Sequence, residues 1–387
     1  MQVITTEKLP IKVWTDYIED GALEQAKALA NLPFVYKWVA IMPDTHQGYG
    51  MPIGGVVATH NVVIPNAVGV DIGCGMKARK TNLTEIDKDI LKKVLNQIQR
   101  DIPTGFNHQS KPQKISDELN DMCTGLSYEN IKLREIVNKM PEQMGTLGGG
   151  NHFIEIQKGD DGHIWIMLHS GSRGIGKMTC DYYNDMAERM NKQWYSYSSK
   201  ELAFLPLDTP QGMEYIQAMK IGMKFAEDNR LHMLDKITAI LGSFFPDMKY
   251  EEAIDTHHNY AQLEHHYSSD VWVHRKGAVR AVGKVIIPGS MGTFSYIGEG
   301  LANPESFWSC PHGAGRRMGR KEAIRQFTAQ SVIEQMKKDD IELYKVKKED
   351  VAEECAQAYK DIDQVMRDSE TLIKPLVKLK PLGVVKG

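Results

Sequence analysis

Two side chains in a glycine-rich stretch have the chemistry of metal ligands. The stretch covers residues 42–76, MPDTHQGYGMPIGGVVATHNVVIPNAVGVDIGCGM, and its segment VGVDIGCG holds Asp71 and Cys74. A carboxylate and a thiolate both bind metal ions once they are deprotonated. Glycine permits backbone angles that other residues avoid, so the segment suits a tight bend around something small. The alternative is a glycine loop with one capping aspartate and one buried, inert cysteine.

Three histidines, each at a strand end or in a glycine-rich setting, extend this ligand set. They are His152 in GTLGGGNHFIEI, His169 in LHSGSRGIG and His258 in HHNYA. A single histidine in such a place is more often structural, but with Asp71 and Cys74 these three supply five ligands. Five ligands exceed one tetrahedral site and fit two metal ions that share a bridging thiolate. Cys74 favours zinc, whereas Asp71 also admits manganese, iron or cobalt, so the ligand set leaves the metal open.

Four short glycine-rich turns, at residues 147–150, 171–176, 288–292 and 313–315, predict phosphate binding through backbone N–H groups. Basic residues accompany these turns in the sequence: Arg173, Arg275, Lys276, Arg280, Arg316, Arg317 and Arg320. None of the turns has the Walker A or Rossmann pattern. The alternative for each basic residue is a solvated surface position.

His312 lies in the segment CPHGAG, after a short loop and before a basic helix. A neutral imidazole there could attack phosphorus and form a phosphoramidate. The position alone leaves three roles open: nucleophile, further metal ligand and structural histidine. Pro311, directly before it, restrains the backbone on the N-terminal side.

The composition is typical of a soluble globular protein, with 387 residues, 42% of them hydrophobic and 25% charged. The net charge of −3 means that an RNA or DNA partner would need a local basic patch. No apolar run reaches membrane-spanning length, and the first residues lack the pattern of a signal peptide. Five cysteines without a CxxC pair argue against a disulfide framework. We therefore expect a cytoplasmic protein without a membrane partner.

Hydrophobic periodicity predicts the elements that must position these residues. Helices are expected at 22–32, 87–100, 177–195, 211–241, 321–338 and 350–367, with weaker helical pieces at 115–122 and 130–140. Strands are expected at 34–42, 56–64, 69–79 and 164–168, after the turn at 145–152, and in a hairpin over 271–287 whose turn is the basic segment 274–277.

The motif-bearing loops are spread from residue 44 to residue 386, and no linker or repeat separates them. This distribution predicts one compact domain over residues 1–387 whose loops converge on one site. The expected fold class is α+β, with mixed β-sheets and peripheral helices. The polar, irregular segment 102–142 is predicted to be a surface insertion.

Taken together, the motifs resemble the RtcB family of RNA ligases. They are MPDTHQGYGMPIGGV, VGVDIGCGM, GTLGGGNHFIE, LHSGSRGIG, HHNYA, HRKGA, IIPGSMGT, CPHGAGRRM and the terminal VVKG. The resemblance covers essentially the whole chain, and the motifs occur in the family's order. It implies an RtcB-type fold, and an enzyme of tRNA splicing or RNA repair that joins 2′,3′-cyclic phosphate or 3′-phosphate ends to 5′-hydroxyl ends. The implied cofactors are GTP and two Mn²⁺ ions, and an archease-type activator is a further implied partner.

The resemblance also assigns roles to residues. His312 would carry GMP, and the resulting 3′-pp-5′-G RNA end would then be sealed. One manganese ion would take Cys74, His169 and His258, and the other would take Asp71, Cys74 and His152. The implied nucleotide contacts are Asn151, His152, Phe153, Ile154, Glu155, His258, Asn259, Pro288, Gly289, Ser290, Met291, Ser295, His312, Gly313, Ala314, Gly315 and Lys386.

Two other functions compete with the ligase. A dinuclear metal phosphoesterase would open RNA 2′,3′-cyclic phosphates with the same ligands, without nucleotide and without His312. A non-catalytic RNA-binding protein would bind RNA in a salt-sensitive way and have no turnover to lose. The complete ligand set and the intact CPHGAG segment favour the ligase.

Overall fold

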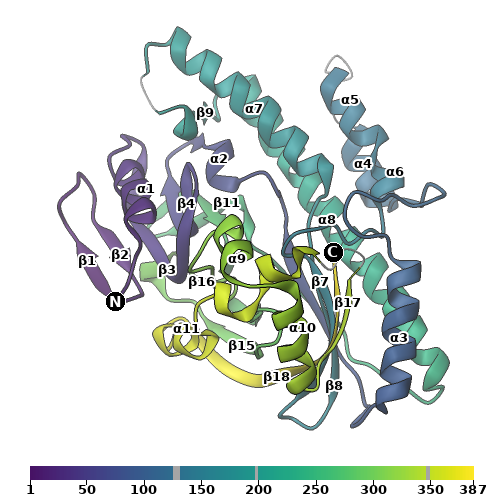
Figure 1. Cartoon of the computed structure of the whole chain (residues 1–387). Coiled ribbons are helices and arrows are strands. Elements are labelled where there is room, and N and C mark those ends of the chain that lie inside the picture. The colour runs from purple at the N-terminus through teal and green to yellow at the C-terminus, as the bar shows by residue number, and fades with distance from the viewer. Residues whose placement is uncertain (125–130, 197–198, 346–348) are drawn as a thin grey trace.

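The computed structural model describes residues 1–124, 131–196, 199–345 and 349–387. Two large β-sheets lie next to each other, and helices cover their outer faces and extend from one end (Figure 1). The predicted α+β fold class is confirmed. Among the described residues, no helix combines the length and the apolar character needed to cross a membrane.

The larger sheet has eight strands and carries most of the predicted ligands. Its order is β10-β6-β8-β7-β18-β15-β14, and β17 pairs with β18 in parallel. The strands are β6 (Gly75–Lys80), β7 (Phe153–Gly159), β8 (Ile164–Ser170), β10 (Ile254–His257), β14 (Val282–Ile287), β15 (Ser295–Leu301), β17 (Glu342–Lys345) and β18 (Ile373–Lys386).

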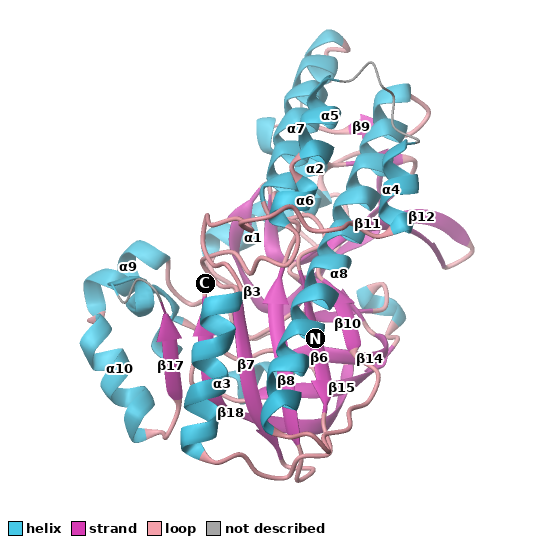
Figure 2. Ribbon diagram, turned by 90° about the vertical axis from the view of Figure 1, so that its right-hand side faces the viewer, coloured by secondary structure: helices cyan, strands magenta, loops and turns pink. Residues whose placement is uncertain are grey.

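Two helices, α3 (Lys88–Asp101) and α8 (Pro210–Phe244), cover one face of this sheet (Figure 2). Helix α3 begins where the Asp87 side chain accepts from the backbone nitrogens of the first turn. It buries Leu91, Val94, Leu95 and Ile98 at helical spacing against alternate residues of β7 and β8. The predicted helices at 87–100 and 211–241 are therefore confirmed, with shifts of a few residues at their ends.

The second sheet has six strands in the order β1-β2-β3-β4-β12-β11. They are β1 (Gln2–Ile4), β2 (Ile11–Val13), β3 (Val35–Tyr49), β4 (Met51–Thr59), β11 (Asn259–His266) and β12 (Ser269–Lys276). Helix α1 (Asp20–Ala30) packs on one face. On the other face, Met42, Val56 and Val273 share a core with Val285 and Ile287 of the larger sheet. This shared core fixes the two sheets relative to each other.

A group of helices stands out from one end of the sheets, as Figure 2 shows. It contains α7 (Gly174–Gln193), the first half of α8, α4 (Asp117–Thr124), α5 (Ile131–Asn138) and α6 (Met140–Gln143). The helical pieces expected at 115–122 and 130–140 correspond to α4 and α5, except that residues 125–130 lie outside the described part. Leu119, Leu133 and Ile136 of segment 102–142 are buried against α7 and α8. That this segment is an insertion stays a prediction.

The hairpin predicted over 271–287 is wrong. The hairpin observed in this region instead joins β11 to β12, and its turn residues Tyr267 and Ser268 both have positive φ. Strand β14 belongs to the other sheet, and β13 (Ala278–Arg280), which lies between β12 and β14, pairs with β16 (Ser309–Pro311). Alternation alone misled here, because a strand that leaves one sheet and enters another keeps the same period.

Three other predicted elements are interrupted. The helix at 321–338 divides into α9 (Arg320–Gln326) and α10 (Ala329–Lys338), since Thr328 caps α10 through the Ser331 nitrogen. The helix at 350–367 is instead η3 (Glu349–Glu354), η4 (Ala356–Ala358) and α11 (Ile362–Asp368). The strand at 56–64 ends at Thr59 and resumes as β5 (Val62–Val63), which pairs with β9 (Leu205–Pro206). The short elements η1 (Lys200–Leu202) and η2 (Pro304–Ser306) complete the chain.

The strand predicted over 69–79 begins only at Gly75. The preceding residues form the short helix α2 (Pro65–Val68) and a turn in which Gly69 and Gly73 have φ of 94° and 69°. Those angles lie in the left-handed region that favours glycine. The turn places Asp71 and Cys74 at the end of β6, where they meet the ends of neighbouring strands.

Candidate active site

The five predicted metal ligands converge at one edge of the larger sheet. Their donor atoms form a series: Asp71 Oδ2 lies 3.1 Å from His152 Nε2, which lies 3.5 Å from Cys74 Sγ. Cys74 Sγ is also 3.2 Å from His169 Nε2, which lies 3.3 Å from His258 Nε2. The sulfur of Cys74 is thus at the centre, between a carboxylate–imidazole pair and a pair of imidazoles.

Sheet register explains this convergence. In the larger sheet β8 lies between β6 and β7, and His169 on β8 faces Met76 on one side and Phe153 on the other. Cys74 precedes β6 and His152 precedes β7, so both lie beside His169. His258 follows β10, and its backbone nitrogen donates to the carbonyl oxygen of Cys74 at 2.9 Å. Residues nearly two hundred positions apart therefore meet at adjacent strand ends.

The donor set fits a bound cation. His152 Nδ1 lies 2.8 Å from the carbonyl oxygen of Leu147, so we assign its proton to Nδ1 and a lone pair to Nε2. That lone pair faces the Asp71 carboxylate, and two acceptors at this distance need a proton or a cation between them. Cys74, His152 and His169 are buried, and their ligand atoms lie within 4.8 Å of one another. Sulfur, nitrogen and oxygen donors together are typical of a transition-metal site.

Burial shifts the ionisation of these groups. Burial lowers the pKa values of His169 and His258 well below the ordinary range, so both imidazoles are neutral and able to act as ligands. Burial also raises the pKa of the Cys74 thiol, so a thiolate there needs a cation beside it. Burial alone would raise the pKa of Asp71, but a proton on His152 Nε2 in the metal-free site, together with Cys74 and Arg173, holds it at about 2.

A cavity of about 510 Å³ lies next to this cluster and includes His169 in its wall. Many of the predicted nucleotide contacts line it: Asn151, Phe153, Glu155, Pro288, Gly289, Ser290, Met291, His312, Gly313, Ala314, Gly315 and Lys386. Other predicted contacts are not part of this wall: His152, Ile154, His258, Asn259 and Ser295. The cavity is large enough for a nucleotide-sized ligand.

His312 lies between the cavity and the metal-ligand cluster. The centroid of its ring is 4.8 Å from that of His258. Its Nδ1 is 2.6 Å from Oδ2 of the fully buried Asp44, which also accepts from the His312 backbone nitrogen at 3.1 Å. His312 directly follows β16, and the loop after it contacts Pro288, whose carbonyl oxygen accepts from Ala314.

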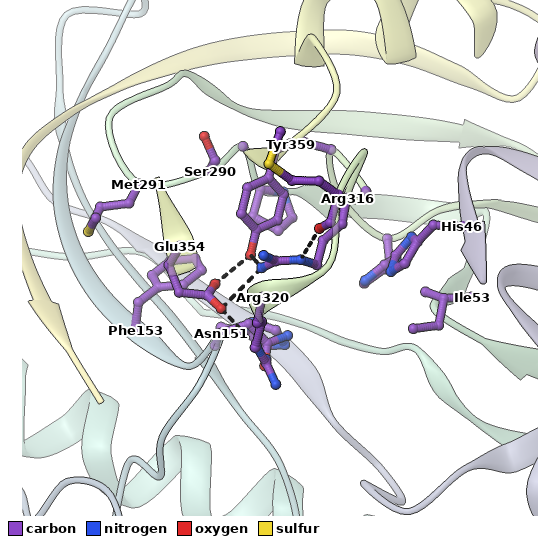
Figure 3. Close-up of a pocket in the computed structure, with 18 of the residues that line it drawn as sticks. His46, Ile53, Asn151, Phe153, Ser290, Met291, Arg316, Arg320, Glu354 and Tyr359 are labelled. Carbon is purple, nitrogen blue, oxygen red and sulfur yellow. Dashed lines mark hydrogen bonds and ion pairs between the residues drawn. The ribbon is translucent and has the colours of Figure 1, made fainter. Parts of the chain in front are cut away.

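A buried carboxylate, Glu354, organises the opposite part of the cavity. Figure 3 shows Arg316, Arg320 and Tyr359 directed toward it, whereas His46 and Ile53 lie across the cavity. Arg316 Nη1 and Arg320 Nε each lie 3.2 Å from Glu354 Oε1. Lys386 Nζ lies 3.6 Å from Oε2, and the Tyr359 hydroxyl donates to the same oxygen. The carboxylate thus holds three cationic side chains at one end of the cavity.

The antiparallel pair β7 and β18 presents the remaining polar groups. Phe153 and Glu155 point into the cavity from β7, and Lys386 of β18 is in register with Phe153. The intervening Ile154 packs its side chain into the core under α3, so only its backbone is available on this side. Burial raises the pKa of Glu155 to about 7, although the hydrogen bond from Gln157 and the charge of Lys386 act in the opposite direction.

Comparison with known proteins identifies the family. A family model described as tRNA-splicing ligase RtcB matches residues 25–387. The chain belongs to the RtcB family. The RNA-splicing ligase RtcB of Escherichia coli strain K12 is 37% identical over 412 residues, covering 100% of this chain and 99% of that protein. The tRNA-splicing ligase RtcB of Methanococcus maripaludis is 34% identical over 443 residues, covering 96% of this chain and 92% of that protein. That of Pyrobaculum aerophilum is 33% identical over 461 residues, covering 98% and 95%.

Two of the basic residues expected to bind phosphate are engaged away from the cavity in this RtcB-family chain. Arg275 is fully buried and contacts Glu264, Ser309 and Phe307. Lys276 donates to the carbonyl oxygens of Tyr49 and Asn66. Neither lines the cavity. Both side chains hydrogen-bond to neighbouring segments of the fold, so the prediction that they hold phosphate is not supported. Arg316 and Arg320, in contrast, line the cavity.

Asn259 and Ser295, predicted as nucleotide contacts, hydrogen-bond to the loops around the cavity. Asn259 Nδ2 donates to the Asp71 carbonyl oxygen at 3.1 Å, and its Oδ1 accepts from Gly277. Ser295 Oγ accepts from the Gly289 nitrogen at 3.1 Å. Their roles toward a nucleotide stay predictions.

Four residues near His312 and the cavity were not assigned roles from the sequence: Asp44, His46, Glu354 and Tyr359. Asp44 and His46 belong to the RtcB-like motif MPDTHQGYGMPIGGV, which is a signal that could have identified them. Glu354 ends the 3-10 helix η3, and Tyr359 directly follows η4, in a region expected to be one amphipathic helix.

Proposed function

We propose that this protein is a GTP- and manganese-dependent RNA ligase of tRNA splicing or RNA repair. It would join RNA 2′,3′-cyclic phosphate or 3′-phosphate ends to 5′-hydroxyl ends. The observation that carries the proposal is the position of His312, whose ring is held by Asp44 at one side and lies 4.8 Å from the His258 ring at the other. A nucleophile, a metal-ligand cluster and a nucleotide-sized cavity thus adjoin one another. The names of the E. coli and archaeal relatives support an RNA substrate.

The proposed first step uses His312 as the nucleophile. Asp44 accepts from Nδ1–H, so Nε2 carries the lone pair. Nε2 attacks the α-phosphorus of GTP, a P–N bond forms, and the bond to pyrophosphate breaks. Lys386 would donate to guanine O6, and the Glu155 carboxylate would accept from N1–H and the amino group.

Two further displacements complete the reaction. An oxygen of the RNA 3′-phosphate attacks the GMP phosphorus and releases His312, which gives a 3′-pp-5′-G end. The 5′-hydroxyl then attacks the RNA 3′-phosphorus, loses its proton and expels GMP. A cyclic phosphate would first be hydrolysed to the 3′-phosphate.

The cluster residues would hold two Mn²⁺ ions, one through Cys74, His169 and His258, the other through Asp71, Cys74 and His152. Metal ions there would supply Lewis-acid polarisation of phosphoryl oxygens. The chain's own contribution is the fixed orientation of the imidazoles, as in His152 Nδ1 donating to Leu147 at 2.8 Å.

A guanylylation assay tests the proposal. Incubation with GTP labelled in the α-phosphate and Mn²⁺ should give a covalent adduct on the wild-type protein and none on His312→Ala. His265→Ala is the matched control, because His265 is exposed and paired with Asp270 outside the cavity. RNA with 3′-phosphate and 5′-hydroxyl ends should be sealed only by adduct-forming proteins, with and without an archease-type activator. Opening of cyclic phosphates without GTP, and without any adduct, would instead identify a phosphoesterase.

A further inference from the structure

Arg230 is a fully buried arginine in the middle of α8. Its guanidinium contacts the three chain segments that carry the predicted ligands Cys74, His169 and His258. Its Nη1 donates to the carbonyl oxygen of Gly73 at 2.9 Å and to that of Ser170 at 3.0 Å. Its Nη2 lies 3.2 Å from His257 Nδ1. Each contacted residue is the immediate neighbour of a predicted ligand in the sequence.

These neighbours define one subset of the cluster. Gly73 precedes Cys74, Ser170 follows His169, and His257 precedes His258. Cys74, His169 and His258 are the three ligands of one proposed metal ion. The other ion's histidine is oriented by a different direct partner, because His152 Nδ1 donates to the Leu147 carbonyl oxygen, which also accepts from Ser170 Oγ.

The guanidinium is itself held in a single orientation. Asp255 of β10 accepts from Nε at 2.9 Å through Oδ1, and its Oδ2 accepts from Lys77 of β6 at 2.8 Å. Gly75 lies directly against it, since a Cβ built on Gly75 would be 3.0 Å from the Arg230 Cζ atom. A planar, five-donor group in a close-fitting pocket has little freedom to move, and lysine cannot reproduce its contacts.

We infer that Arg230 is a positioning residue for the Cys74–His169–His258 metal position, which it orients through the backbone of Gly73 and Ser170 and through His257. This inference rests on the proposed two-ion site. It states that one residue of α8 positions the ligands of one of the two ions. Partners that orient metal ligands typically change affinity by about 10- to 100-fold when they are mutated.

The test measures Mn²⁺ binding directly, by titration of the metal-free protein with the free ion followed by electron paramagnetic resonance. Wild-type protein should bind two ions. Arg230→Lys should weaken one of them by about 10- to 100-fold. The other ion shares only Cys74 with this set, so its affinity should fall by a smaller factor. Arg275→Lys is the matched control, because Arg275 is also fully buried and paired with a carboxylate, but its partners Glu264, Ser309, Phe307 and Tyr260 are not sequence neighbours of a predicted ligand. It should lower thermal stability and leave both Mn²⁺ affinities unchanged.

Asp255→Asn provides a second variant that retains Arg230 but weakens its contact with Asp255, together with that of Lys77, and should weaken the same ion to a smaller extent. Equal affinities in Arg230→Lys and wild type, or equal weakening of both ions, would overturn the assignment. Failure of the proposed function is a separate result, since it would appear as a wild-type protein that binds no Mn²⁺ or forms no guanylyl adduct.

Discussion

Asp44 Oδ2 accepts two hydrogen bonds from one residue, from Nδ1 of His312 at 2.6 Å and from the His312 backbone nitrogen at 3.1 Å. The carboxylate therefore fixes the ring, the peptide to which it is attached and the position of the proton. An imidazole held in this way presents Nε2 as the only nitrogen with an available lone pair. Asp44 orients the proposed nucleophile in the same way that a triad carboxylate orients its histidine.

Replacing Asp44 with asparagine should separate orientation from nucleotide binding. The amide can donate to Nδ1, which would favour the tautomer with a proton on Nε2, so adduct formation with GTP should slow by about 10²- to 10⁴-fold. The affinity for GTP should change much less, because Asp44 does not line the cavity. Rapid-quench measurement of adduct formation alongside calorimetric measurement of GTP affinity checks this. An unchanged rate would show that Asp44 has only a structural role.

Cys74 is central to the series of donor atoms, so Cys74→Ser should affect both metal positions. We expect bound Mn²⁺ to fall from two ions per protein to less than one. The rate of RNA sealing should fall by more than about 100-fold, which exceeds the loss typical of a residue that only hydrogen-bonds to a metal ligand. Metal analysis after dialysis measures the occupancy. Cys180→Ser is the control, because Cys180 is equally buried but contacts Pro65 and Asn66. Retention of two ions in Cys74→Ser would rule out shared thiolate ligation.

Most residues of the cluster around Cys74 could be identified as candidate metal ligands because each lies in a local signal. Asp71 and Cys74 lie in a glycine turn, and His152 and His169 lie at the ends of apolar strands. Such signals are visible in a short window of sequence. The structure adds the register that makes His169 the neighbour of both Met76 and Phe153, which no short window contains.

Relationships between distant segments could not be predicted in this way. Asp44 and His312 are separated by 268 positions, and neither local pattern specifies the other. The basic segment 274–277 illustrates the opposite error. It was predicted to be the turn of a hairpin, but Arg275 lies in a strand and is buried, paired with Glu264 on the neighbouring strand. A sequence pattern alone predicts that a charged residue is exposed to solvent. Its burial becomes evident only when the oppositely charged residue on the neighbouring strand is known.

Glu155 predicts a pH dependence of nucleotide binding. Burial raises its pKa to about 7, so below that pH its carboxyl group is mostly neutral. Guanine presents N1–H and amino donors, which need the ionised form, so GTP affinity should rise about tenfold per pH unit up to about pH 7 and then level off. Phosphate groups of GTP also titrate in this range. The measurement is therefore the ratio of wild-type to Glu155→Gln affinities between pH 5.5 and 8.5 by calorimetry, and a constant ratio would contradict the assigned role.

Glu354 predicts an acid-sensitive contribution to stability. Burial alone would raise its pKa, but Lys386, Arg320, Tyr359 and Arg316 hold it at about 2, below the ordinary value of 4.5. A depressed pKa in the folded state stabilises the protein above the unfolded value, and this stabilisation is lost as the pH falls from about 4.5 toward 2. The shift corresponds to roughly 3 kcal/mol at neutral pH.

Glu354→Gln should therefore unfold at a lower urea concentration than wild type at pH 7, and this difference should shrink by pH 3.5. The variant also leaves three cations without their shared carboxylate, which adds to its loss of stability at pH 7. Urea unfolding at both pH values measures these effects. Glu334→Gln on the exposed side of α10 is the control and should match wild type throughout. A stability difference that is the same at pH 7 and pH 3.5 would mean that Glu354 acts through its shape and not its charge.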